Sequence, residues 1–329
     1  MPSTGPEAGG AGLRPVIAVA CGAIVNPQGE VLIAQRPAGK IEPGESAEDA
    51  LRRELDEELS LQVQRARPLI RIRHDYSDRT VVLDTWLVEA FHGEPQSRER
   101  QAFAWVSPAR LAHWDLLAAD APIVSALQLP VHYVFTPARI PVGELLDGIG
   151  ALPAGALLRL RQPELDDRRY EALAQQLLPA CRSAGLRLML DRSIEQVLRL
   201  DADGWHASER VLLGEALQRR LPRAKLLAVS VHDAPGIAAA RARTADCAVL
   251  GPVHETPTHP GARGLGWPGF AALAGEAGLP VYAIGGVGPA CIAESFRRGA
   301  QGVAGIRAYW PSSRSDGSAG ASSSRTGRA

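Results

Sequence analysis

Short apolar runs separated by polar turns occupy the first third of the chain, and they predict strands around one charged helix. The runs cover residues 16–25, 30–36 and 79–91, and NPQG at 26–29 forms a turn between the first two. A segment rich in Glu, Arg and Leu at 47–59 is typical of a helix. We expect a small α+β domain in which this helix packs on a mixed sheet.

The pattern changes near Leu129 and Pro130. From there on, short apolar runs alternate with stretches rich in Ala, Leu, Arg and Glu. Such alternation predicts parallel strands, for which a closed (β/α)8 TIM barrel is the economical arrangement and an open doubly wound sheet the alternative. The expected strands are residues 131–136, 156–161, 186–191, 203–208, 225–232, 246–251, 280–286 and 302–307.

Length and composition limit the classes of function. The 329 residues suffice for two domains, expected at 14–129 and 130–310, between Gly- and Ser-rich ends at 1–13 and 311–329 that we expect to be disordered. The net charge of zero argues against a binder of nucleic acid polymers or membrane surfaces. No signal peptide or bilayer-spanning run is visible, and four scattered cysteines indicate buried free thiols. We therefore expect a cytoplasmic protein.

Three carboxylates share one face of the predicted helix. Glu54, Glu57 and Glu58 stand at positions i, i+3 and i+4, where like charges repel by a few tenths of a kcal/mol. A bound divalent cation reverses that effect, and carboxylate oxygens suit Mg²⁺ or Mn²⁺. Arg53 can pair with one of them and orient it. The alternative is a solvated acidic helix held by charge pairs.

These carboxylates belong to a longer pattern over residues 39–61, whose helix starts with the capping sequence S-x-x-D at 46–49. The pattern resembles the Nudix hydrolase signature at every defining position except Ser60, where the family has glycine. Because a glycine there can end the helix in a left-handed conformation, serine is expected to cost roughly 1 kcal/mol of strain. The pattern reads Gly39-x5-Glu45-x7-Arg53-Glu54-Leu55-x-Glu57-Glu58-x-Ser60-Leu61.

The closer resemblance, over about 16–128, is to the MutT type of Nudix hydrolase, and the segments ending in AQRP and GEP carry it. It implies a nucleotide substrate, 8-oxo-dGTP, cleaved to the monophosphate and pyrophosphate in nucleotide-pool sanitation. It also implies a metal site for Mg²⁺ or Mn²⁺. The implied metal ligands are the Gly39 carbonyl, Glu54, Glu57, Glu58 and Glu99.

The same resemblance assigns further roles. Arg53 would belong to the catalytic set, and either Glu54 or Glu99 would take the proton of the attacking water. Arg36 and Asp120 would bind the nucleotide, with Asp120 at the purine edge. Compared with MutT-type chains, the lead-in to residues 39–61 is about a dozen residues shorter. We expect one strand of the sheet to be absent, and an inactive hydrolase domain stays open as a hypothesis.

The second half resembles the thiamine phosphate synthase and thiazole tautomerase group over about 131–310. DGWHAS, AVSVH, GPVHETPTHPG, AIGGV and GVAGIR carry the resemblance, and each lies at the C-terminal end of an expected strand, where barrel enzymes build active sites. The loop at 304–306 and the glycine pair at 285–286 are expected to form a phosphate-binding cradle of backbone N–H groups. The implied substrate-binding residues are Arg161, Ser230, Thr256, Thr258, Gly285 and Gly286.

Several polar positions depart from the synthase pattern. Pro163 and His259 stand where lysines are expected, and Leu190-Asp191 replaces an Asn-Asp pair. Two hypotheses for the barrel follow: a transferase or tautomerase acting on thiazole phosphate, or a non-catalytic module binding a phosphorylated thiazole or pyrimidine ligand. Histidines near the mouth could do acid–base work or be structural. They are His206, His232, His254 and His259.

Overall fold

The computed structural model describes residues 14–34, 38–96, 102–114, 117, 120–214, 221–256 and 263–310. The expected disorder at 1–13 and 311–329 concerns residues outside this set. The N-terminal elements are β1 (Val16–Ile24), β2 (Val31–Ala34), β3 (Ala38–Lys40), α1 (Ala47–Leu59), β4 (Gln62–Asp75), β5 (Thr80–His92), β6 (Phe103–Val106), the 3-10 helix η1 (Pro108–His113) and α2 (Ala121–Gln128).

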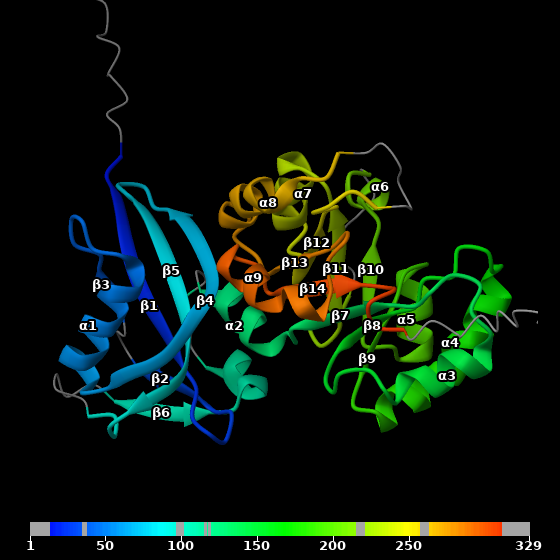
Figure 1. The fold of residues 1–329 in the computed structure, drawn as a ribbon, viewed down its shortest axis with the longest axis horizontal. Coiled ribbons are helices and arrows are strands. Elements are labelled where there is room, and N and C mark those ends of the chain that lie inside the picture. Colours follow the sequence, from blue (N-terminus) through cyan, green and yellow to red (C-terminus); the bar gives the residue numbers. More distant parts are fainter. Residues whose placement is uncertain are drawn as a thin grey trace, which may run out of the picture.

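The remaining elements alternate strand and helix (Figure 1). They are β7 (His132–Phe135), α3 (Val142–Ile149), β8 (Leu157–Arg159), α4 (Asp167–Ser183), β9 (Arg187–Leu190), α5 (Ile194–Leu200), β10 (Gly204–Ala207), α6 (Glu209–Leu212), β11 (Leu226–Val231), α7 (Ala234–Ala242), β12 (Cys247–Leu250), α8 (Gly266–Gly275), β13 (Val281–Ala283), the 3-10 helix η3 (Pro289–Cys291), α9 (Ile292–Arg297) and β14 (Gly302–Gly305).

A mixed sheet organises the N-terminal half. Its strand order is β3-β1-β5-β4, with β1 parallel to β5 and the other pairs antiparallel, and β2 pairs with β6 in a second small sheet. Leu51 and Leu55 of α1 pack on one face with Ala20, whereas Ala126 of α2 packs with Ala23 in a separate cluster. Since neighbouring strand residues point to opposite faces, the sheet is covered by α1 on one side and α2 on the other (Figure 1).

The helix predicted at 47–59 is confirmed as α1. Ser46 caps it, because its hydroxyl oxygen accepts a hydrogen bond from the Asp49 amide at 3.1 Å. The helix ends at Ser60, which has φ 57° and ψ 35°. The left-handed ending that the family builds with glycine is therefore kept by a serine.

The expected loss of a strand before α1 is wrong in part. Three residues form β3 and pair antiparallel with β1, so that Gly39 lies opposite Ala20. The sequence interpretation also missed β4, which alternates buried residues such as Ile70 and Ile72 with exposed arginines such as Arg71. That alternation is the strand signal, but the arginines give the segment a polar composition.

In the described part of the chain, eight parallel strands close into a barrel in the sequential order β7 to β14. This confirms the TIM barrel and excludes the open sheet. Alternate strand residues fill the interior, including Tyr133, Met189 and Tyr282, while Val134 and Leu188 pack outward with the helices. Interior positions at the C-terminal ends of the strands therefore line the mouth.

Side chains of Arg67 and Gln301 make contacts that join the halves. The Arg67 guanidinium of β4 lies 3.9 Å from the centre of the Phe296 ring of α9, and its Nε donates to Glu89 at 3.1 Å. The buried Gln301 amide donates at 3.0 Å to the carbonyl oxygens of both Ala126 and Leu129. The end of α2 is therefore hydrogen-bonded directly to the start of β14. Within the described residues, no helix has the length and apolar character needed to cross a membrane.

Replacing Gln301 with Ala is expected to lower the free energy of unfolding by about 1–3 kcal/mol, because two buried carbonyls lose their donor. Urea denaturation followed by circular dichroism measures the change. Gln176→Ala, on the exposed side of α4, is the matched control and should stay within about 0.5 kcal/mol of the wild type. Equal effects of the two substitutions would contradict the role given to Gln301.

Candidate active sites

Arg53 organises the carboxylates around α1. Its Nε donates to Glu45 at 2.9 Å and its Nη1 donates to Glu54 at 2.7 Å, while Glu57 lies 3.6 Å away. The hydrogen bond from Arg53, with a smaller contribution from the Glu42 amide, lowers the pKa of Glu45. The predicted pairing of Arg53 with the acidic face is therefore present, and it extends to Glu45 in the preceding loop.

Gly39 lies directly against Glu54. It is buried, and a Cβ built there would overlap the side-chain carboxyl group of Glu54. Arg53 also donates to the carbonyl of the next residue, Lys40, at 3.3 Å. The structure therefore brings β3 and the acidic face of α1 together, as the resemblance implied for Gly39 and Glu54.

The oxygen donors on this face are of the kind that Mg²⁺ or Mn²⁺ binds, namely carboxylates and a backbone carbonyl. Among the residues that the structure describes, no three His, Cys, Asp or Glu side chains form a group that could hold a metal ion. The Arg53 guanidinium forms ion pairs with Glu45, Glu54 and Glu57. Glu99 and Arg36 lie outside the described residues.

Asp120 lies on the other side of the sheet from α1. It precedes α2, and its carboxylate accepts a hydrogen bond from the Leu117 amide at 3.2 Å. Burial raises the pKa of Asp120 and also that of Asp84 on β5. Burial, with Asp120 and then Asp84 nearby, raises the pKa of the Cys21 thiol to about 12. The sequence interpretation did not single out Asp84. A lone carboxylate inside the apolar run VVLDTW could have drawn attention to it.

A buried ion pair lies inside the barrel mouth. Nη2 of Arg159 donates to Asp191 at 3.0 Å, and the guanidinium lies 4.9 Å from the centre of the Phe135 ring. The Tyr170 hydroxyl lies 3.1 Å from the other oxygen of Asp191 and accepts a hydrogen bond from the Asp191 amide. The sequence interpretation missed Arg159 and Tyr170. The alternation of ALLRLR, which points both of its arginines to one side, could have found Arg159.

A second polar group crosses the barrel interior. The Tyr133 hydroxyl lies 2.7 Å from Nδ1 of His206, and Nε2 of His206 lies 2.8 Å from Oγ of Ser230. Tyr133 and His206 are fully buried, whereas Ser230 is half-buried near the C-terminal end of β11. Of the mouth residues expected from the sequence, Ser230 and His206 are thus brought together.

The other mouth residues are less closely gathered. His232 is exposed and contacts the Gly251 carbonyl, and His254 packs edge-on against Trp267 at 6.0 Å. The Arg161 amide donates to the Thr136 hydroxyl at 2.9 Å. Thr256 is half-buried. Thr258 and His259 lie outside the described residues.

The two residues after Ile284, which follows β13, occupy positions that only glycine can fill. Gly285 and Gly286 have φ values of +96° and +68°, and a Cβ on them would meet Pro252 at 2.5 Å and His254 at 2.8 Å. Glycine alone tolerates both conditions, so the backbone of this loop runs close to the loop after β12. A tight turn at Gly285 and Gly286 therefore lies at the barrel mouth, where the sequence predicted a phosphate-binding cradle.

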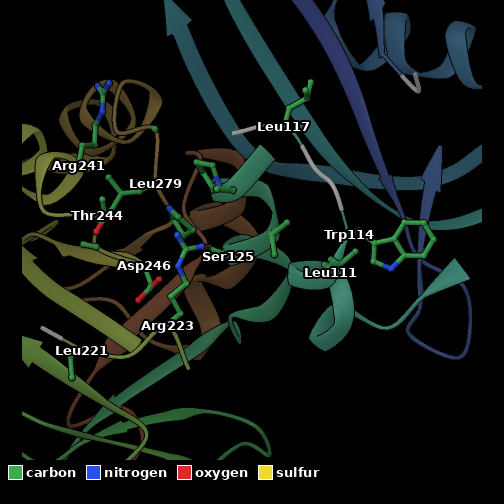
Figure 2. A pocket seen from close by; sticks show the side chains of 16 residues that line it. Leu111, Trp114, Leu117, Ser125, Leu221, Arg223, Arg241, Thr244, Asp246 and Leu279 are labelled. Atoms are coloured by element: carbon green, nitrogen blue, oxygen red, sulfur yellow. The ribbon is translucent and has the colours of Figure 1, made fainter. Parts of the chain in front are cut away.

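A cleft of about 980 Å³ separates the two halves on the opposite side of the barrel (Figure 2). Arg223, Asp246 and Leu279 line it just before β11, β12 and β13, and Ser125 and Trp114 line it from the N-terminal half. In Figure 2, Trp114 lies at one end and the barrel residues at the other. Of the predicted site residues that the structure describes, none lines this cleft.

Comparison with known proteins assigns each half. Residues 14–127 match the NUDIX domain, and residues 133–309 match the thiamine monophosphate synthase family. A CTP pyrophosphohydrolase of Escherichia coli (strain K12) is 37% identical over 116 residues, covering 32% of this chain and 86% of that protein. An 8-oxo-dGTP diphosphatase of the same organism is 34% identical, covering 33% of this chain and 95% of that protein.

For the barrel, a thiamine-phosphate synthase of Roseiflexus sp. (strain RS-1) is 34% identical over 180 residues, covering 54% of this chain and 76% of that protein. The closed eight-stranded barrel and the mixed sheet with its acidic helix agree with these matches. The chain therefore belongs to the Nudix hydrolase family through its N-terminal half and to the thiamine monophosphate synthase family through its barrel.

Proposed function

We propose that the domain at 14–129 is a Mg²⁺- or Mn²⁺-dependent nucleoside triphosphate pyrophosphohydrolase that cleaves 8-oxo-dGTP to 8-oxo-dGMP and pyrophosphate. The observation that carries the proposal is the set of carboxylates on α1, which Arg53 and Gly39 fix in place. The likeness to an 8-oxo-dGTP diphosphatase supports this substrate. The proposal includes a cytoplasmic role in nucleotide-pool sanitation and DNA repair. The likeness to a CTP pyrophosphohydrolase makes CTP the substrate to compare.

In this proposal, Glu54, Glu57, Glu58, Glu99 and the Gly39 carbonyl hold the metal. A bound metal would neutralise charge on the phosphate oxygens and favour attack by water. Glu54 or Glu99 accepts the proton of that water, and clustered carboxylates of this kind titrate together.

Substrate binding and orientation fall to other residues. Arg53 keeps the Glu54 carboxylate oriented through the 2.7 Å hydrogen bond. Arg36 contacts the phosphates and Asp120 the base. Asp120 is half-buried with a raised pKa, which suits a carboxyl that reads a purine edge.

The test offers the purified chain 8-oxo-dGTP, dGTP and CTP with Mg²⁺, and measures release of pyrophosphate and nucleoside monophosphate. The expected result is faster turnover of 8-oxo-dGTP than of dGTP. Glu57→Gln serves as the inactive control. Turnover no faster than that control with every nucleotide would overturn the proposal and leave an inactive hydrolase domain.

For the barrel at 130–310 we propose a site for a phosphorylated thiazole or pyrimidine ligand. Ser230, Arg161 and the turn at Gly285 and Gly286 lie at the C-terminal ends of β11, β8 and β13 around one mouth, which supports it. If the barrel is a transferase, it forms thiamine phosphate from the pyrimidine diphosphate and thiazole phosphate. If it is a binding module, it binds thiazole phosphate without turnover. Product analysis and calorimetry with these two compounds distinguish the outcomes, and neither binding nor turnover would overturn the proposal.

A further inference from the structure

The two hydrogen bonds that join Tyr133, His206 and Ser230 can form with either of two proton arrangements. In the first, the Tyr133 hydroxyl donates to Nδ1 of His206, and the proton on Nε2 is donated to Oγ of Ser230. In the second, Ser230 donates to Nε2, and the proton on Nδ1 is donated to the Tyr133 oxygen. Both fit the distances of 2.7 Å and 2.8 Å.

The surroundings of Tyr133 decide between the two arrangements. Its ring is fully buried against Phe135 and Tyr282, and within the described residues its hydroxyl has no hydrogen-bond partner other than His206. In the second arrangement the hydroxyl proton of Tyr133 would therefore be buried without an acceptor, which is unfavourable. In the first arrangement the proton without an acceptor among the described residues belongs to Ser230, which is half-buried at the mouth and open to a ligand.

The surroundings of the His206 ring also exclude a doubly protonated, positively charged imidazole. The ring is fully buried, and its neighbours are the aromatic rings of Tyr133 and Phe135, with the positive Arg159 on β8 nearby. Burial, and then the charge of Arg159, keep the pKa of His206 well below its usual range. The imidazole is therefore neutral and carries its proton on Nε2.

We infer that Tyr133 and His206 are positioning residues that make Ser230 a hydrogen-bond donor to an anionic oxygen at the barrel mouth. The hydroxyl of Ser230 cannot donate to His206, because Nε2 already carries a proton that points at Oγ. Its own proton is directed to whatever occupies the mouth, and a phosphate oxygen is the acceptor that such a donor suits. The inference rests on the proposal that the barrel binds a phosphorylated ligand.

Nitrogen-15 NMR of the full-length chain labelled at histidine measures the proton arrangement without any ligand. We expect His206 to show a protonated Nε2 and an unprotonated Nδ1, unchanged between pH 5 and pH 8, with His206→Gln assigning the signal. In Tyr133→Phe we expect a mixture of the two neutral forms, because the phenolic donor is gone. A proton on Nδ1, or an imidazolium in this pH range, would overturn the inference.

Calorimetric titration of thiazole phosphate into the full-length chain measures the consequence for binding. We expect Ser230→Ala to weaken binding about tenfold and Tyr133→Phe about threefold to tenfold. Tyr282→Phe is the matched control, since it removes another buried hydroxyl, one that donates to the Pro130 carbonyl at the other end of the barrel. It should bind as the wild type does.

The outcomes separate the two proposals. Wild-type affinity in Tyr133→Phe overturns the positioning role while leaving the barrel a binding site. No binding by the wild type overturns the barrel function, and with it the role of Ser230, while the NMR measurement still decides the proton arrangement of His206.

Discussion

Asp191→Leu is expected to destabilise the barrel by about 3–5 kcal/mol, because it leaves the Arg159 guanidinium buried without its counter-charge. The side chains of the pair are only 11% and 12% exposed, and Nη2 of Arg159 lies 3.0 Å from Oδ2 of Asp191. Tyr170 would also lose the carboxylate that its hydroxyl contacts. Urea denaturation followed by circular dichroism measures the loss.

The double variant Arg159→Met with Asp191→Leu should recover most of that stability, since apolar side chains of similar volume can replace a buried ion pair at little net cost. Arg182→Met is the matched control in the same domain. Its ion pair with Asp201 is exposed, so that its loss should cost less than about 1 kcal/mol. A cost for Asp191→Leu no larger than that of this control would show that the Arg159 charge is solvated in the folded protein.

Gly39→Ala is expected to lower kcat/KM for 8-oxo-dGTP about 100-fold or more, with the fold retained. The added methyl group would overlap the carboxyl group of Glu54, which must then leave its position beside Arg53. Displacement of one preorganised charged group at a phosphoryl-transfer site costs rate on this scale.

Steady-state kinetics of the purified variant measures the change, and circular dichroism checks the fold. Glu54→Gln keeps the size of the side chain and removes its charge, and it should lose activity to a similar degree. Gly150→Ala adds the same methyl group at a position where, apart from the adjacent backbone, no described atom lies within 4 Å, and it should match the wild type. Activity of Gly39→Ala within about threefold of the wild type would show that the close contact with Glu54 has no role in catalysis.

Local features of the sequence were enough to predict much of the fold. Each barrel strand falls within the range expected for it, because every strand is a short apolar run between helix-forming stretches. The acidic face of α1 was predictable for the same reason, since residues at i, i+3 and i+4 share a face in any helix. β4 was missed because its outward arginines hide the alternation of its buried residues.

Contacts between distant segments could not be predicted in this way. Arg53 bonds to Glu45 across a loop, and that loop conformation is set by tertiary structure. Tyr133 meets His206 only because the barrel closes, which brings side chains of β7 and β10 together across the interior. Such pairs follow from the topology once the inward positions of each strand are known.

The sheet lies between α1 and the barrel, so that the acidic helix is on the face away from the barrel and α2 is on the face toward it (Figure 1). The cleft between the halves lies at the end of the barrel opposite its mouth. Within the described residues, neither the carboxylates of α1 nor the glycine turn at the barrel mouth lines this cleft. A single chain of this kind supplies the two domains in equal copy number.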